Sequence, residues 1–306
     1  MSFPISGVHI APAWLVLVGF IAGLLGGFFG VGGSFIAGPA LYALRVPMNF
    51  VVGTDLAHIV GKSIVAFRSH RELGHVDYKL GFYMLIGTLP GVEIGARLIE
   101  HLKRTAHIDW VVGGSMVLIL ISLSAFMAWE SWATLTRKKT PRAEDAAHSK
   151  GGDHSAFAHI AVVVQRFALP PHIQLPISGI KRISVWSIML VSLAAGFLGG
   201  FLGGGAGYFR MPAMIYLLGL PTHIAVGTDL FEVIISAGFG TVTHALKGNV
   251  DILIALVMHT GAAIGAQIGA LLTQYFAGVR IRLAFIPLPL IGAGLMIYGL
   301  VTGHKL

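Results

Sequence analysis

The sequence contains no cysteine among its 306 residues, and charged residues are scarce. Without cysteine, the chain cannot form a disulfide, a thiolate metal site or a cysteine nucleophile. Asp, Glu, Lys and Arg make up only 11% of the chain, whereas a soluble globular protein has about 25%. This scarcity of charge excludes an ordinary soluble enzyme.

The few charged residues leave long apolar stretches between them. Five segments contain no Asp, Glu, Lys or Arg: 10–44, 110–129, 183–209, 252–279 and 283–303. An uncharged apolar run of about 18 residues or more is long enough to cross a membrane. Since 55% of the residues are hydrophobic, the composition predicts an all-α polytopic membrane protein.

The basic residues have a distribution typical of membrane proteins. The formal net charge is +8, but the lysines and arginines lie beside the spans, which is the positive-inside pattern and gives no reason to expect nucleic acid as a partner. Residues 131–184 hold eight basic and three acidic residues, a net charge of +5, together with several prolines. We therefore expect a basic, cytoplasmic linker over 131–184, with a weak strand or hairpin pattern at 157–167. Residues 1–13 lack the features of a signal peptide and should lead into a retained helix.

The segments on either side of this linker are copies of each other. Gly23–Gly30 matches Gly196–Gly203 at an offset of 173 residues, and the Gly-Thr-Asp motifs at 53–55 and 227–229 match at an offset of 174. These matches predict a first transmembrane repeat over 1–130 and a second over 185–306. Two such halves are typical of transporters whose substrate site lies between the repeats.

Each repeat should contain four long helices and one short piece, giving about 8–10 membrane helices in all. The expected ranges are 14–30, 34–46, 50–68, 79–99, 109–129, 185–203, 207–219, 222–245, 250–274 and 282–302. The short pieces at 34–46 and 207–219 cannot cross about 30 Å of hydrocarbon, and each follows a glycine-rich turn, which predicts a broken or re-entrant helix. Five crossings per repeat would make the repeats inverted and four would make them parallel; the loop charges leave this open.

Two glycine-rich motifs carry a family resemblance. Residues 30–39 (GVGGSFIAGP) and 203–212 (GGGAGYFRMP), each followed by a proline and a Gly-Thr-Asp motif, resemble the TauE/SafE family. The resemblance covers residues 12–130 and 185–303, and the first motif has Ser34 in place of the usual third glycine. It implies a transporter that moves small sulfur-containing anions, such as sulfite or organosulfonates, across the bacterial cytoplasmic membrane.

The glycine-rich turns are candidate anion sites. Unpaired backbone N–H groups at the start of a short helix, together with the helix dipole, attract an anion without a buried positive charge. The alternative is that these glycines only allow helices to pack closely. The candidate substrate-binding residues at the turns are Gly32, Gly33, Ser34, Gly204 and Gly205.

A polar stripe follows each Gly-Thr-Asp motif. Asp55, His58 and Lys62 share one helical face at i, i+3 and i+7, and ionisable residues inside a span mark an ion or proton pathway by default. Lys62 can neutralise Asp55 or bind an anionic substrate. The matching positions of the second repeat are Asp229, Glu232 and Ser236.

These stripes predict proton coupling. Two carboxylates one turn apart, at Asp229 and Glu232, have no matching lysine, and their mutual repulsion favours holding a proton. We therefore assign ion or proton coupling to Asp55, His58, Asp229 and Glu232. In the alternative, each aspartate of a Gly-Thr-Asp motif only caps the start of its helix.

Other charged residues fall inside predicted spans. Arg210 lies in the second short piece, and its planar guanidinium suits a tetrahedral oxyanion, so it is a candidate substrate ligand; the alternative is that it snorkels to the interface. Glu93, with Gln267 opposite it in the other half, and His259 are candidates for a proton relay or for an interhelical hydrogen bond. Three residues near helix ends are expected to be interfacial: His70, Arg71 and His244.

These features favour a secondary transporter, acting as an exporter and not as an enzyme. No Walker motif, zinc-protease motif or G-x-S-x-G motif is present, and no cofactor or metal site is expected. The expected partners are the small anionic substrate and membrane lipid, and small-residue faces would permit a homodimer. The alternatives are a carrier of another small anion, a proton-coupled uptake permease, a channel, and an intramembrane aspartyl protease that uses Asp55 and Asp229.

Overall fold

A computed structural model describes residues 1–30, 33–104, 107–136, 164–165, 169–276 and 283–303. The first half holds β1 (Ser2–Phe3), β2 (Val8–His9), α1 (Pro12–Phe29), α2 (Ser34–Ala43), α3 (Met48–Glu72), α4 (Tyr78–Lys103) and α5 (Ile108–Thr136). The second half holds β3 (His172–Leu175), β4 (Ile180–Ser184), α7 (Val185–Leu202), η2 (Gly204–Ala206), α8 (Gly207–Ala213), η3 (Met214–Leu218), α9 (Thr222–Leu246), α10 (Ile252–Thr273) and α12 (Pro287–Gly303).

The all-α polytopic fold is confirmed. The described residues contain eight helices that are long and apolar enough to cross a membrane, four from each half. Most helix ends agree with the predicted ranges to within about four residues, because the apolar runs and the flanking polar residues fix them locally. Helix α5 extends seven residues beyond the predicted end at 129, α12 begins five residues after 282, and the piece predicted at 207–219 is divided into α8 and η3. The strand predicted at 157–167 falls outside the described residues, apart from 164–165.

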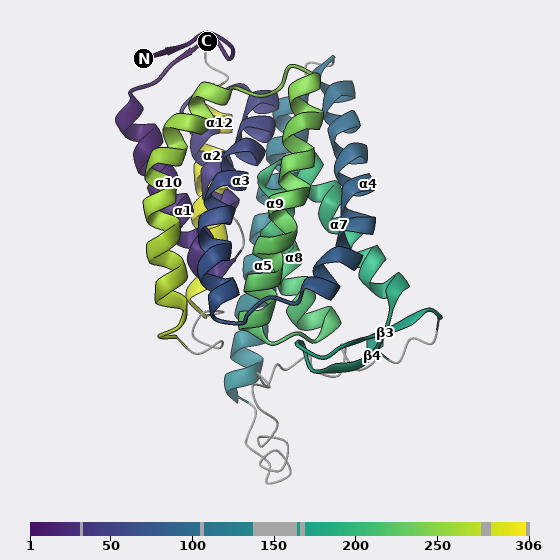
Figure 1. Cartoon of the computed structure of the whole chain (residues 1–306). Helices are drawn as coiled ribbons and strands as arrows, with labels where there is room; N and C mark the ends of the chain where they lie inside the picture. Colours follow the sequence, from purple (N-terminus) through teal and green to yellow (C-terminus); the bar gives the residue numbers. More distant parts are fainter. Residues whose placement is uncertain (31–32, 105–106, 137–163, 166–168, 277–282, 304–306) are drawn as a thin grey trace.

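The two halves run in opposite directions along the bundle. Figure 1 shows the β1–β2 hairpin and the β3–β4 hairpin at opposite ends, so α1 and α7 start from opposite ends. The expectation that four crossings per half would make the repeats parallel is therefore wrong. The short helix explains the difference: α2 has 10 residues and is only about 15 Å long, yet it reverses the direction of the chain.

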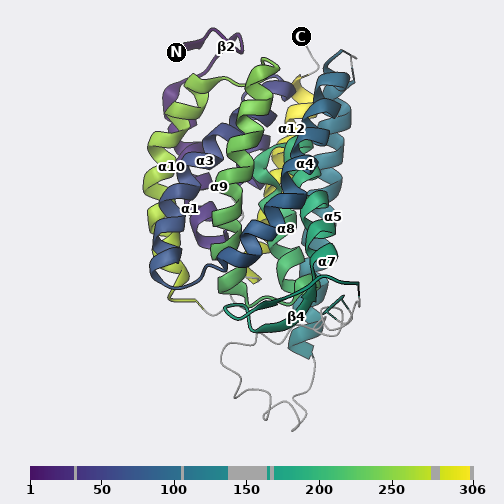
Figure 2. The ribbon, with the colours of Figure 1, turned by 45° about the vertical axis from the view of Figure 1, so that its right-hand side comes forward.

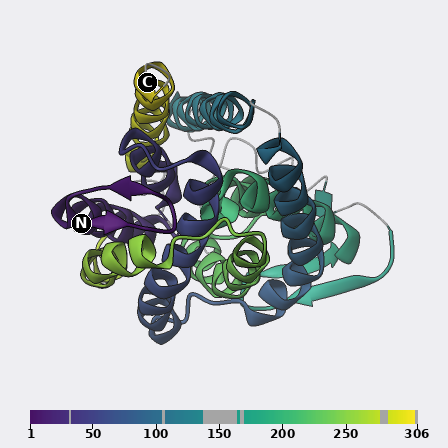
Figure 3. The same ribbon diagram turned by 90° about the horizontal axis from the view of Figure 1, so that it is seen from above.

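The halves are intertwined, since the main helix pairs join one half to the other. Helix α1 packs on α10, α7 on α4, and α3 on α9, and the three pairs can be followed in Figure 2. Figure 3 shows α5 and α12 side by side at one edge of the bundle. The site between α3 and α9 is thus built from both halves.

Glycine stripes allow two of these helix pairs to approach closely. A Cβ added to Gly23 would lie 2.3 Å from the carbonyl oxygen of Ala262, and one on Gly196 would lie 2.1 Å from that of Thr88. No side chain fits at such distances, so the backbones of α1 and α10, and of α7 and α4, are in contact. The packing role of glycine therefore holds for these helix stripes.

A terminal hairpin belongs to each half and was not detected as part of the repeat. The tetrapeptide Pro-Ile-Ser-Gly occurs at 4–7 and again at 176–179, in the turns of the β1–β2 and β3–β4 hairpins. Ser6 Oγ donates to Asp251 Oδ2 at 2.6 Å, and Ser178 Oγ donates to Asp77 Oδ2 at 2.6 Å. The two copies of Pro-Ile-Ser-Gly are 172 residues apart, close to the offset of 173 that relates the glycine-rich motifs. The boundaries 1–130, 131–184 and 185–306 remain predictions.

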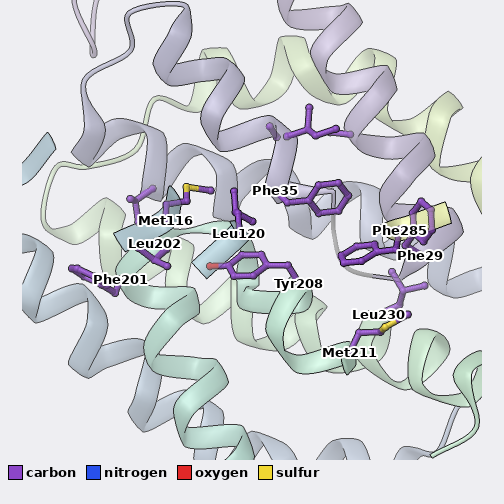
Figure 4. Packing of buried hydrophobic residues seen from close by; sticks show 14 of the residues in the cluster. Phe29, Phe35, Met116, Leu120, Phe201, Leu202, Tyr208, Met211, Leu230 and Phe285 are labelled. Atoms are coloured by element: carbon purple, nitrogen blue, oxygen red, sulfur yellow. The ribbon is translucent and has the colours of Figure 1, made fainter. Parts of the chain in front are cut away.

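An aromatic core supports the helix breaks. The Phe285 ring lies 5.4 Å from that of Phe29 and 5.3 Å from that of Phe35, in edge-to-face contacts between ring centroids. Figure 4 shows these rings together with Tyr208 within one buried apolar cluster. The core thus fixes the end of α1 and the start of α2, where the polar residues of the site begin.

Candidate substrate site

The first polar group lies on α3 and is closed off from solvent. Lys62 Nζ donates to His58 Nδ1 at 3.2 Å, and His58 Nδ1 lies 3.6 Å from Asp55 Oδ1. Ser34, at the start of α2, hydrogen-bonds to the Asp55 carboxylate. All four side chains are buried, and we call Ser34, Asp55, His58 and Lys62 the Lys62 cluster.

The tautomer of His58 follows from its partner. A lysine ammonium has only donors, so Nδ1 of His58 accepts and the ring proton is on Nε2. This Nε2 has no hydrogen-bond partner among the described residues, although the ring is buried. The Lys62 cluster therefore contains an unpaired N–H donor.

The second polar group lies between α8 and α9. Arg210 forms ion pairs with Asp229 through Nε and with Glu232 through Nη1. Ser236 Oγ donates to Glu232 Oε2 at 3.1 Å. These side chains are also buried, and we call Arg210, Asp229, Glu232 and Ser236 the Arg210 cluster.

This geometry changes the interpretation of two sequence features. The two carboxylates of α9 do have a cation, but it is Arg210 of α8 and not a lysine of their own helix. Arg210 does not snorkel, since its side chain is fully buried. Two carboxylates surround one guanidinium, so the fully ionised cluster has an excess of one negative charge.

The Gly-Thr-Asp motifs do not cap helices. Asp55 lies within α3, which begins at Met48, and Asp229 lies within α9, which begins at Thr222, so the capping alternative is wrong. The aspartates that do cap helices belong to a later motif. Asp77 accepts from the Leu80 N–H of α4, and Asp251 accepts from the Leu253 and Ile254 N–H groups of α10.

The glycine and threonine of each motif join the halves. Thr54 Oγ1 accepts a hydrogen bond from the Asp251 N–H at 2.9 Å, and a Cβ added to Gly53 would lie 2.1 Å from the Asn249 carbonyl oxygen. At the opposite end of the bundle, Thr228 Oγ1 accepts from the Asp77 N–H at 2.9 Å. Each motif thus holds one end of the bundle closed and places its aspartate in a buried cluster.

The two glycine-rich turns meet beside the Lys62 cluster. Gly203, Gly204 and Gly205 have φ values of 80°, 78° and 62°, which favour glycine. A Cβ added to Gly204 would lie only 2.4 Å from Ser34 Cβ. Gly33 also has a positive φ of 66°, whereas Gly32 lies outside the described residues. Anion binding by the backbone of these turns remains a prediction.

Several other candidates lie away from the two clusters. Glu93 is partly exposed and pairs with Arg97 at 2.7 Å and with Lys247 at 3.7 Å. His70 Nε2 lies 3.2 Å from the Gly27 carbonyl oxygen, and His244 Nε2 lies 3.0 Å from that of Gly200. Both histidines are buried against helix backbones in the last turns of α3 and α9, whereas Arg71 is exposed. The interfacial depth of these three residues remains a prediction.

Two residues join the site through tertiary contacts. His259 of α10 packs over Gly61, where an added Cβ would lie 2.1 Å from His259 Cε1, and it interacts electrostatically with His58 and Lys62. Tyr208 of α8 interacts electrostatically with Asp55 and was not identified as a site residue. Its position within the second glycine-rich motif was the available signal. Within the described residues, no group of three or more His, Asp or Glu is arranged to hold a metal ion.

The described residues form a helical bundle of two intertwined halves with eight candidate membrane spans and with buried charged clusters beside the helix breaks. This arrangement is typical of a multi-pass membrane transporter. A family model described as "Sulfite exporter TauE/SafE" matches residues 15–296. The chain belongs to the TauE/SafE family of membrane transporters.

Two of the curated relatives match most of the chain. The "Probable membrane transporter protein YunE" of Bacillus subtilis (strain 168) is 29% identical over 297 residues, which cover 94% of this chain and 98% of the relative. YjnA of the same organism, with the same description, is 25% identical and covers 86% of this chain and 91% of its own. The "Sulfite exporter TauE/SafE family protein 6" of Arabidopsis thaliana is 25% identical over 114 residues, which cover 36% of this chain and 27% of the relative. No solved structure is a significant match to the chain.

Proposed function

We propose that this protein is a secondary transporter that exports small sulfur-containing anions, such as sulfite or an organosulfonate, across the bacterial cytoplasmic membrane. One observation carries the proposal: each half places a fully buried charged cluster beside a helix break in the middle of the bundle. Ionisable groups inside a membrane are costly, so their retention indicates a transport pathway.

The membrane potential favours export. An anion that leaves a cell with a negative interior gains about 2.3 kcal/mol per charge for each 100 mV. A uniporter therefore needs neither a coupling ion nor a nucleotide for this direction. The family description and the printed name of the Arabidopsis relative both refer to sulfite export, which supports the choice of substrate.

Transport requires that the ends of the bundle open in turn. The clusters are closed off from solvent, and hydrogen bonds between the halves hold each end together through Thr54 and Thr228. Opening one end at a time would expose the clusters to one side of the membrane. If the basic segment 131–184 is cytoplasmic, the β3–β4 end of the bundle faces the cytoplasm.

The alternatives have less support. An aspartyl protease needs two carboxylates that share one proton, but Asp229 is paired with Arg210, and Asp55 interacts with Lys62. One feature favours proton-coupled uptake: the Arg210 cluster has one more carboxylate than it has cations, and this carboxylate can bind a proton. The dependence of flux on a pH gradient separates uptake from uniport.

The proposed function can be tested by flux through purified protein in proteoliposomes. We expect labelled sulfite or a C2 sulfonate to leave the vesicles under an imposed membrane potential without a pH gradient. Arg210→Ala should abolish this flux, whereas the matched control Arg97→Ala should retain it, because Arg97 is 75% exposed and pairs only at the surface. Absence of flux for every sulfur oxyanion would contradict the substrate, and a strict need for a pH gradient would contradict uniport.

A further inference from the structure

Tyr208 has a buried hydroxyl that the described structure leaves unpaired. The residue lies in the first turn of α8, directly after the glycine-rich break, and it is fully buried. Its Oη has no hydrogen-bond partner among the described residues. A buried hydroxyl without a partner costs free energy, and such a group calls for an explanation such as a ligand.

Tyr208 lies beside the Lys62 cluster. The Tyr208 ring and Ser34 both lie against Gly204, since a Cβ added there would be 3.5 Å from Tyr208 Cε1 and 3.1 Å from Ser34 Oγ. Tyr208 and Lys62 both interact electrostatically with Asp55. In Figure 4 the ring and the oxygen of Tyr208 lie among apolar side chains such as Leu120 and Leu202, which offer no partner for the hydroxyl.

Packing explains the ring of Tyr208 but not its hydroxyl. At an offset of 173, the corresponding residue of the first half is Phe35, which is also fully buried at the start of its short helix. An aromatic ring therefore fills this position in both halves. Only the second half adds an O–H group, and it adds it beside the cluster of the first half.

The two clusters differ in the balance of their unpaired donors and acceptors. The Lys62 cluster and Tyr208 provide two unpaired donors, His58 Nε2 and Tyr208 Oη, and one unpaired acceptor, Asp55 Oδ1. They lie beside a lysine that uses one of its three protons on His58. In the Arg210 cluster, Arg210 Nη1 is engaged by its ion pair with Glu232 and Nη2 has no partner, and two acceptors, Asp229 Oδ2 and Glu232 Oε1, are unpaired. Donors bind an anion, whereas unpaired carboxylate oxygens repel it.

The net charges of the two clusters also favour an anion at the Lys62 cluster. One ammonium balances one carboxylate in the Lys62 cluster, while the Arg210 cluster has one more carboxylate than it has cations. An anion is therefore bound more favourably at the Lys62 cluster, although Arg210 is the stronger cation. In the described conformation, Nε and Nη1 of Arg210 are already paired with the carboxylates of Asp229 and Glu232.

We propose that the transported oxyanion binds at the Lys62 cluster and that the Tyr208 hydroxyl donates a hydrogen bond to one of its oxygen atoms. This inference rests on the proposed function, and it identifies the half of the site that recognises the substrate. Lys62 supplies the charge, and His58 Nε2 and Tyr208 Oη supply directed donors. Ligands with several oxygen acceptors, such as sulfite or a sulfonate, fit this arrangement.

The test is Tyr208→Phe in the full-length protein, which keeps the ring and introduces the residue type found at position 35. Tyr216→Phe is the matched control, because Tyr216 Oη donates to Glu130 Oε2 at 3.0 Å outside the Lys62 cluster. We expect Tyr208→Phe to raise the sulfite concentration at half-maximal flux by about tenfold, since a hydrogen bond to a charged group is lost. Tyr216→Phe should lower thermal stability and leave this concentration within about twofold of the wild type, because its hydrogen bond is structural.

A binding measurement separates this inference from the proposed function. Purified wild type, Tyr208→Phe and Tyr216→Phe are titrated with sulfite and with a C2 sulfonate, and the rise in unfolding temperature is recorded. Stabilisation of the wild type without any flux would reject the transport function and leave the site in place. The inference would be overturned if Tyr208→Phe responded at the same anion concentration as the wild type, or if neither anion stabilised the wild type.

Discussion

The Asn49 side chain donates a hydrogen bond to Asn249 Oδ1 at 3.0 Å, joining α3 to the loop before α10. At an offset of 174, the corresponding residues at the other end of the bundle are His223 and His75, whose ring centroids lie 5.2 Å apart. Equivalent contacts thus close the two ends, but only one end uses histidine rings, which can bind a proton.

This difference predicts that acid weakens one end of the bundle. His75 lies in the loop between α3 and α4, and burial, with a smaller contribution from His223, lowers its pKa from 6.5 to about 4. The folded state therefore favours the neutral ring, so its contribution to stability is complete above pH 6.5 and is lost as the pH falls towards 4. His75→Asn, which copies the residue type of position 249, should reduce the fall in unfolding temperature over this range. The exposed control His9→Asn should not, and an equal effect of both would contradict the prediction.

Removal of Arg210 should destabilise the protein more than removal of its whole cluster. Arg210→Met leaves the Asp229 and Glu232 carboxylates buried without a cation, which costs about 3–5 kcal/mol. The triple variant with Asp229→Asn and Glu232→Gln removes the uncompensated charge and should recover most of the unfolding temperature measured in detergent. A triple variant that is no more stable than Arg210→Met alone would mean that the ion pairs are not the main contribution of Arg210.

The threonines of the two Gly-Thr-Asp motifs should control opposite ends. Thr54→Val leaves the Asp251 N–H unpaired, and Thr228→Val does the same for the Asp77 N–H; each change should weaken one end by about 1–3 kcal/mol. The native chain has no cysteine, so Ser63→Cys, buried in α3, provides one reporter for a membrane-impermeant maleimide.

We expect Thr54→Val to speed labelling of this cysteine only from the side of the β1–β2 hairpin. Thr228→Val should speed it only from the β3–β4 side. Thr260→Val is the control, because its exposed hydroxyl bonds only within α10. Faster labelling from the same side in both threonine variants would contradict alternating opening of the two ends.

The glycine contacts between the halves should be sensitive to any side chain. Gly196→Val places methyl groups where the Thr88 carbonyl oxygen lies 2.1 Å from the added Cβ, so α7 and α4 must separate at a cost of about 1–3 kcal/mol or more. Gly238→Ala meets no atom within 4 Å and should be neutral or stabilising in a helix. Both variants are heated and passed over a size-exclusion column, and the temperature at which half of the monodisperse peak is lost is recorded for each. Equal temperatures for Gly196→Val and Gly238→Ala would contradict the packing role of Gly196.

The sequence alone was enough to locate the membrane helices and most of their ends. Long uncharged runs and glycine-rich breaks are local properties of the sequence. A run can be assigned as a membrane helix because the thickness of the hydrocarbon core sets the number of apolar residues that a spanning helix needs. The repeat, the family and the stripe of Asp55, His58 and Lys62 were also readable, because helical periodicity places i, i+3 and i+7 on one face. The repeated tetrapeptide Pro-Ile-Ser-Gly at 4–7 and 176–179 is a further local signal, and it marks the hairpin of each half.

The contacts that make the site depend on the tertiary structure. Arg210 and its partner Asp229 are 19 residues apart, and Tyr208 reaches Asp55 from the other half of the chain. No local period relates such positions. They meet because the short helices reverse the chain, the halves run in opposite directions, and glycine allows helices from different halves to touch. Close packing of two intertwined halves, rather than any single motif, decided which buried charges have partners and which donors remain unpaired.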